Sequence, residues 1–212
     1  EAAPPARVRP PLTNATKFGQ KRPITGNKPV APPAESFTQE ALDIPDTDVQ
    51  AAVAGMKTHG HARDRHGPEV TDDQLALRAM YKVDPISQTL EDGEKPGKAH
   101  NASKHATQFT SERAIAQARM AVENSDEFKR KLANAMAGST TPSFTVETVT
   151  LEAAMGSYYK QHVRGKTRIG SVKNPNGTVD TDFTNGQIIA VYKIDSSGKI
   201  KLHTLYPNPI NP

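Results

Sequence analysis

The chain of 212 residues has no cysteine, no tryptophan and few aromatic side chains (5%). It therefore cannot form disulfides or thiolate metal sites, and a folded domain must depend on its hydrophobic core. No apolar stretch approaches the roughly 20 residues that a membrane-spanning helix needs, and no signal peptide is visible. The sequence also lacks a row of aromatic residues on which several nucleic-acid bases can stack.

Hydrophobic residues make up only 35% of the chain, and many of its 17 prolines lie within the first 33 residues. We expect residues 1–34 to form a Pro-rich disordered linker and residues 35–54 an acidic connector, with a short helix around Thr47–Met56. Residues 55–212 are expected to form one folded domain. Because the chain starts with Glu rather than Met, we expect it to be a piece of a longer polypeptide.

Charge is distributed unevenly around a net value of +4. The connector, residues 35–54, holds five acidic residues and no Lys or Arg, whereas residues 158–212 hold eight Lys or Arg against three Asp, a net +5. A basic C-terminal segment is compatible with a polyanionic partner such as nucleic acid but does not require one.

Residue spacing predicts helices first and antiparallel strands last, which is an α+β fold. Expected N-caps are Asp46 or Asp48, Thr71 (with Gln74 as a capping box), Thr110 or Ser111, and Ser125, while Gly138 ends the last helix. Residues 83–107 are expected to be loop. Strands are expected within residues 144–151, 169–172, 186–194 and 199–207, with turns at 174–177 and 195–198.

Three short segments carry side chains that reactions use, although one of them, residues 106–111, is by itself typical of a loop followed by a helix cap. His61, Arg63, Arg65 and His66 lie close together before a helix, which is also compatible with a solvated, charged loop. No metal site is expected, because the seven His are scattered, no HExxH pattern occurs, and two His five residues apart face different ways on a helix. In the last strand, alternation places Leu202, Thr204 and Tyr206 on one face and Lys201, His203 and Leu205 on the other.

Taken in order, these features resemble the ribonuclease A-like toxin domains of bacterial contact-dependent inhibition and related polymorphic toxins. The resemblance covers about residues 55–209. The matching residues are His61, Arg65-His66-Gly67, Gln74-Leu75, Arg78, Thr107-Gln108-Phe109-Thr110, Ala114, Ile188–Tyr192 and Thr204-Leu205-Tyr206-Pro207. After His66 the chain reads Gly-Pro-Glu-Val, where the family usually has Val-Gly.

The resemblance implies helices followed by a curved antiparallel sheet, ribonuclease A-like without disulfides. It also implies a metal-independent endoribonuclease toxin with no cofactor, secreted or delivered into the cytoplasm of a competing bacterium. Its partners would be RNA and a cognate, acidic immunity protein, without membrane insertion. The implied catalytic residues are His61, His66, Arg78, Thr204 and Tyr206, and the implied substrate-binding residues are Arg65, Thr107 and Thr110.

The chemistry suits these residue types. Cleaving RNA without a metal needs a base for the 2′-hydroxyl, an acid for the leaving 5′-oxygen, and donors for the charged phosphorane. His61 and His66 both suit the acid–base work, and the sequence leaves open which of them does it. Two alternatives remain: a ribonuclease toxin of the barnase, colicin or RelE-like group, and a basic binding module without catalysis. A catalyst needs the His segment within about 10 Å of Thr204 and Tyr206.

Overall fold

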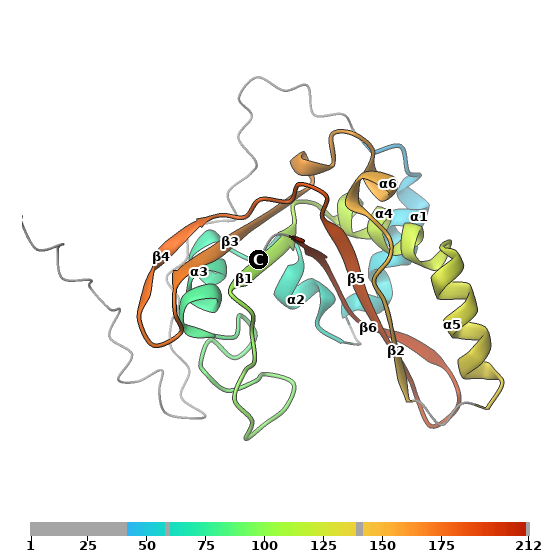
Figure 1. Cartoon of the computed structure of the whole chain (residues 1–212). Coiled ribbons are helices and arrows are strands. Elements are labelled where there is room, and N and C mark those ends of the chain that lie inside the picture. Colours follow the sequence, from blue (N-terminus) through green and yellow to red (C-terminus); the bar gives the residue numbers. More distant parts are fainter. Residues whose placement is uncertain (1–41, 58–59, 139–141, 211–212) are drawn as a thin grey trace, which may run out of the picture.

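The computed structural model describes residues 42–57, 60–138 and 142–210 (Figure 1). The expected linker, residues 1–34, and the first part of the acidic connector lie outside the described residues. Most of the rest of the connector forms α1 (Asp46–Ala54), and a 3-10 turn, η1 (Gly55–Lys57), follows directly after it. Ile44, Val49 and Val53 are buried in the main core, so the packed unit includes residues from 42 onward.

Local capping explains most of the helix starts. Thr71 and Gln74 form the expected capping box at the start of α3 (Asp72–Tyr81). Ser111 and Ser125 cap α4 (Glu112–Glu123) and α5 (Asp126–Met136), as predicted. The expectation for α1 is wrong, because its N-cap is Pro45 and has no side-chain cap. The Asp46 carboxylate instead forms an ion pair with Arg113 of α4.

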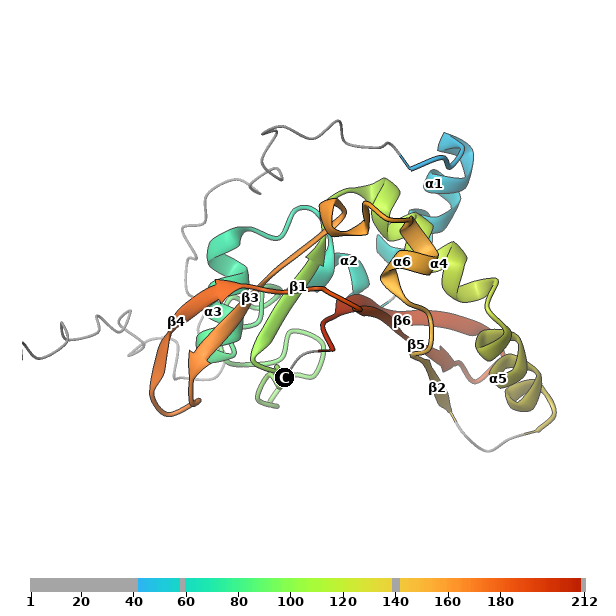
Figure 2. The same cartoon turned by 45° about the horizontal axis from the view of Figure 1, so that its top comes forward.

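The strands form two antiparallel sheets of three strands each, which confirms the α+β class. The first has the order β1 (His105–Phe109), β3 (Val163–Gly170) and β4 (Pro175–Asp180), and the second has β2 (Ser143–Val146), β5 (Gln187–Ile194) and β6 (Ile200–Asn208). Figures 1 and 2 show α3 beside the first sheet and α4 beside the second, with α1 and α6 (Leu151–Met155) packed against α4.

Several elements depart from the expected pattern. Strand β1 occupies the end of the predicted loop; four of its five residues are buried, so no alternation marks it. Within the predicted strand 144–151, strand β2 ends at Val146, and Thr150 caps the short helix α6. The predicted turn at 174–177 lies mostly within β4, and a second 3-10 turn, η2 (Tyr159–Gln161), precedes β3. The hairpin joining β5 and β6 is confirmed.

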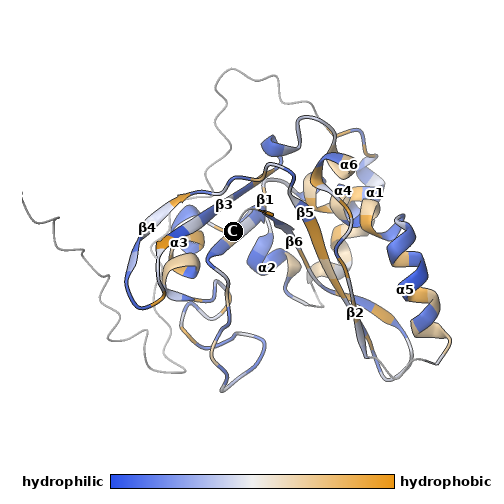
Figure 3. Cartoon of the chain, in the orientation of Figure 1, coloured by the Kyte–Doolittle hydropathy of each residue, from blue (hydrophilic) through white to orange (hydrophobic). Residues whose placement is uncertain are grey.

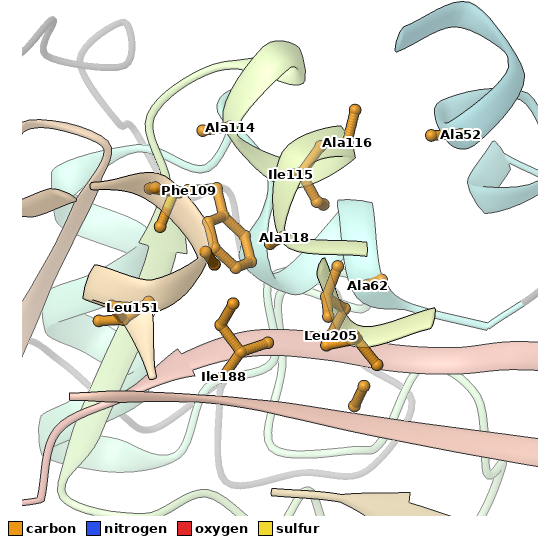
Figure 4. Packing of buried hydrophobic residues seen from close by; sticks show 14 of the residues in the cluster. Ala52, Ala62, Phe109, Ala114, Ile115, Ala116, Ala118, Leu151, Ile188 and Leu205 are labelled. Atoms are coloured by element: carbon orange, nitrogen blue, oxygen red, sulfur yellow. The ribbon is translucent and has the colours of Figure 1, made fainter. Parts of the chain in front are cut away.

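The main core lies between the helices and the second sheet. Figure 3 shows hydrophobic residues gathered on β5 and on the nearby helices. Figure 4 shows Phe109 and Ile188 pointing toward each other, with Ile115 of α4 and Leu205 of β6 nearby; all four are buried. A smaller cluster of Val70, Leu75, Ala79 and Ala106 fixes α3 against the first sheet. None of the described helices combines the length and apolarity needed to cross a membrane.

Candidate active site

The short helix α2 (Ala62–His66) lies between the two sheets and contacts β1 and β6 (Figure 1). Its N-cap, His61, donates its backbone N–H to the carbonyl oxygen of His203 at 2.9 Å. Gly60 makes this approach possible, because a Cβ at that position would lie 2.1 Å from the same oxygen. Gly60 also has a φ of +70°, which favours glycine. Both His of the motif are thereby fixed against the last strand.

His66 is buried between β1 and β6. Its Nδ1 lies 2.8 Å from the carbonyl oxygen of Thr107, and because a carbonyl only accepts hydrogen bonds, Nδ1 carries the proton. The ring stacks on that of Tyr206, with centroids 4.9 Å apart. Burial, followed by the nearby Arg78 guanidinium, lowers the pKa of His66 well below 6.5. The side chain is therefore neutral at pH 7, and Nε2 offers a lone pair.

Arg78 reaches this region from α3. Its Nε donates to Nε2 of His100 at 3.1 Å, and the Nδ1 of His100 in turn lies 3.2 Å from a carboxylate oxygen of Asp92. Its Nη1 is buried and has no hydrogen-bond partner among the described residues. Burial, with Arg65 as the next cause, lowers the pKa of Arg78 to about 10, so the group stays cationic at neutral pH. The site thus contains a buried cation, and its Nη1 group is available to donate a hydrogen bond to a ligand.

Strand β6 supplies two hydroxyls on one face, as alternation predicts. Thr204 and Tyr206 stand opposite Val191 and Ile189 of β5. The Oγ1 of Thr204 is buried and lacks a hydrogen-bond partner within the described residues. Burial raises the pKa of Tyr206, so its phenol keeps its proton at neutral pH.

The expected position of His203 is wrong. The β5–β6 register shifts between Val191 and Tyr192, which pair with Thr204 and Leu202, and the extra residue on β6 is His203. Such a bulge interrupts strict alternation. Leu202 therefore shares the core with Leu205 instead of the face of Thr204. The His203 ring packs edge-on against His61, with centroids 4.6 Å apart.

Glu94 is a further member of the cluster that sequence reasoning missed. Its Oε2 lies 2.6 Å from Nδ1 of His61 and 3.9 Å from Nε2 of His203. Burial raises the pKa of Glu94. Burial and the field of Arg65 lower the pKa of His61 to about 2. Glu94 comes from a loop with no periodic pattern, so no local signal in the sequence could have placed it here.

The three residues expected to bind substrate make internal contacts. Arg65 is buried and donates to both carboxylate oxygens of Asp84, at 3.0 and 2.6 Å, and to Asp92 at 3.0 Å. Thr107 donates its hydroxyl to the carbonyl oxygen of Pro207 at 2.7 Å, which links β1 to β6. Thr110 donates its hydroxyl to the carbonyl oxygen of Gln161 at 3.2 Å. All three side chains therefore make hydrogen bonds within the protein that hold the elements around the site in place.

Four of the five expected catalytic side chains, His66, Arg78, Thr204 and Tyr206, therefore form one group. The fifth, His61, lies beside it, with its ring centroid 6.5 Å from that of His66. The group combines a neutral imidazole, a buried cation, an unpaired hydroxyl and a protonated phenol, which can accept a proton, bind an anion and donate a proton. Comparisons with protein-family models, curated proteins and solved structures find no match to this chain.

Proposed function

We propose that this protein is a metal-independent endoribonuclease that cleaves RNA by transphosphorylation. The observation that carries the proposal is a pair of buried donors, Arg78 Nη1 and Thr204 Oγ1, that lack partners among the described residues. An unsatisfied buried donor costs about 1–3 kcal/mol. One of these donors acts on His66 and the other lies on the same strand as Tyr206, so the two indicate a ligand rich in acceptor oxygens. A phosphodiester has these oxygens and carries the charge that complements Arg78.

The contacts of His66 support its role as the general base. With Nδ1–H held by the Thr107 carbonyl, Nε2 can accept the proton of a ribose 2′-hydroxyl. Its lowered pKa keeps it unprotonated before substrate binds. A bound phosphodiester offsets the positive field of Arg78, which raises the pKa of His66 and strengthens it as a base.

The remaining steps follow from the other groups. The 2′-oxygen attacks phosphorus, the bond from phosphorus to the 5′-oxygen breaks, and a 2′,3′-cyclic phosphate forms. Arg78 and Thr204 donate hydrogen bonds to the non-bridging oxygens as charge develops on them. Tyr206 donates its phenolic proton to the departing 5′-oxygen. The proton on His66 then returns through solvent to the phenolate, which restores the starting state.

His61 is assigned a positioning role. Its Nδ1 faces Glu94, its ring packs on His203, and its backbone N–H is bonded to β6. These contacts fix α2, and therefore His66, against the last strand. The choice between the two His, which the sequence leaves open, is thus proposed in favour of His66.

The geometry favours an enzyme over a basic binding module. A catalyst needs the His segment within about 10 Å of the last strand, and the His66 and Tyr206 rings are 4.9 Å apart. A binding module has no need to pair a neutral imidazole with a protonated phenol. The order of motifs supports a toxin of the ribonuclease A-like group, and a barnase, colicin or RelE-like toxin is the second candidate.

The biological setting is proposed on the same resemblance. The toxin forms part of a larger secreted polypeptide, acts in the cytoplasm of a competing bacterium, and is silenced in its producer by an immunity protein. An acidic partner complements the net +5 of residues 158–212 and is captured faster for that reason. Part of this charge is neutralised internally, since Arg164 and Lys166 both pair with Asp72. A natural partner with a basic contact face contradicts this part of the proposal.

Product analysis tests the proposed reaction. The purified protein is incubated with single-stranded RNA in EDTA, and the fragments are identified by mass spectrometry. We expect 2′,3′-cyclic phosphate ends, and a DNA strand of the same sequence should stay intact because it lacks the 2′-hydroxyl. Cleavage of DNA, or of RNA only after a divalent ion is added back, contradicts the mechanism.

A further inference from the structure

His61, Glu94 and His203 meet beside the proposed cleavage group although they come from three separate segments. His61 is the N-cap of α2, Glu94 belongs to the loop before β1, and His203 is the bulged residue of β6. One ligand atom from each residue can be chosen so that all three lie within 4.8 Å of one another. The bulge matters here, because regular alternation would turn the His203 ring away.

The donor set and spacing suit a small divalent transition-metal ion. Zn²⁺ binds His nitrogen and carboxylate oxygen at about 2.0–2.2 Å, and a tetrahedral arrangement then separates its ligand atoms by roughly 3.3 Å. The Glu94 oxygen lies 2.6 Å from the His61 nitrogen and 3.9 Å from that of His203, and all three ligand atoms lie within 4.8 Å of one another. Side-chain shifts of up to about 1.5 Å therefore bring them to the spacing of a zinc site.

Solvent access leaves room for a fourth ligand. The side chains of His61, Glu94 and His203 are 12%, 22% and 18% exposed. An ion can therefore enter without unfolding the protein, and a water molecule can complete the coordination. Two imidazoles with one carboxylate and a water match the three-ligand pattern of open zinc sites.

A neighbouring cluster of similar composition serves as a contrast. Asp84, Asp92 and His100 also lie close enough to hold an ion, but all three are buried, and the Arg65 guanidinium bonds directly to both carboxylates. That cation occupies the place of a metal. Within the described residues, the Glu94 carboxylate lies within 3.9 Å of a ring nitrogen of His61 and of His203 and pairs with no Lys or Arg. At longer range, the charges of Arg65 and Lys193 weaken its attraction for a cation, and those of Asp92 and Asp84 strengthen it.

We propose that His61, Glu94 and His203 bind one divalent transition-metal ion, with Zn²⁺ best suited to the site. The ion ties α2, the Glu94 loop and β6 together, and it leaves His66, Arg78, Thr204 and Tyr206 without a metal bond. It therefore stabilises the folded protein without supplying the cleavage chemistry. Because the ion binds only the native state, it raises the melting temperature, and the gain in stability grows with the logarithm of the ion concentration above Kd.

Calorimetric titration of the metal-free full chain with ZnCl2, together with thermal unfolding, tests this site. We expect one ion per chain and a higher Tm, and four-coordinate Co²⁺ should give visible absorption bands. Glu94→Gln and His203→Ala should weaken binding beyond the about 10- to 100-fold that outer-shell changes cost, and the Tm gain should disappear. His105→Ala, whose ring bonds to Thr167 on the first sheet, is the matched control and should bind like the wild type.

His66→Ala separates this proposal from the proposed function, because it should keep zinc binding while losing RNA cleavage. Circular dichroism confirms that each variant is folded, and Glu94→Gln keeps the shape of the side chain if His203→Ala does not fold. Absence of Zn²⁺ binding by the wild type overturns the proposal. So does wild-type affinity in both Glu94→Gln and His203→Ala.

Discussion

The ring of His66 on α2 stacks on the ring of Tyr206 on β6, with centroids 4.9 Å apart and an angle of 25° between the planes. These residues lie at opposite ends of the folded domain in sequence. Two contacts hold the pair together: His66 donates to the Thr107 carbonyl, and the Thr107 hydroxyl donates to the carbonyl of Pro207, next to Tyr206. The fold thereby places a neutral base and a protonated phenol side by side.

Thr204→Val should change activity and stability in opposite directions. The valine keeps the volume but removes a buried hydroxyl that has no partner among the described residues. We expect kcat to fall by about 10²–10³, the value of one transition-state hydrogen bond. The free energy of unfolding should rise, by at most about 1–3 kcal/mol, because an unsatisfied polar group is removed. Urea unfolding and RNA-cleavage rates check the two effects, and a variant with wild-type activity contradicts the role of Thr204.

The dependence of kcat/KM on pH should report the lowered pKa of His66. A general base works unprotonated, so activity falls as pH decreases through its pKa in the free enzyme. Burial and Arg78 lower this pKa, and the acid limb should therefore lie below pH 6.5. Initial rates over about pH 4–8 measure it, with circular dichroism at each pH as the control. An acid limb at or above the ordinary histidine value argues against His66 as the base.

Arg65→Met should destabilise the protein strongly. Arg65 bonds to the buried Asp84 and to Asp92, and methionine leaves these carboxylates without their cation. Breaking a buried pair in this way costs about 3–5 kcal/mol in the free energy of unfolding. The matched control, Arg130→Met on the exposed face of α5, should stay within about 0.5 kcal/mol. If Arg65→Met is as stable as wild type and only raises KM, Arg65 contacts RNA instead.

Part of this site could be predicted from the sequence because it depends on local periodicity. Thr204 and Tyr206 are two residues apart on a strand, and the Thr71–Gln74 capping box places Arg78 on a well-defined helix. His203 could not be placed, because one bulged residue reverses the face that alternation predicts.

Long-range contacts set the rest of the site. Glu94 reaches His61 from a loop 33 residues away, and no local pattern encodes that approach. Strand β1 escaped prediction because its residues are buried on both faces and show no alternation. Its Thr107 and Gln108 make buried hydrogen bonds to α2, β6 and the segment between α2 and α3, and these contacts exist only once both sheets are formed.

The most direct test compares RNA cleavage by the wild type and by His66→Ala in EDTA, with His105→Ala as the control. We expect the wild type to cleave RNA, His105→Ala to keep that rate, and His66→Ala to lose about 10²–10⁴ in kcat, the usual contribution of general acid–base catalysis. Tyr206→Phe should also lose about 10²–10⁴, because it removes the proposed general acid. Full activity of a folded His66→Ala, or no RNA cleavage by the wild type, contradicts the proposed active site.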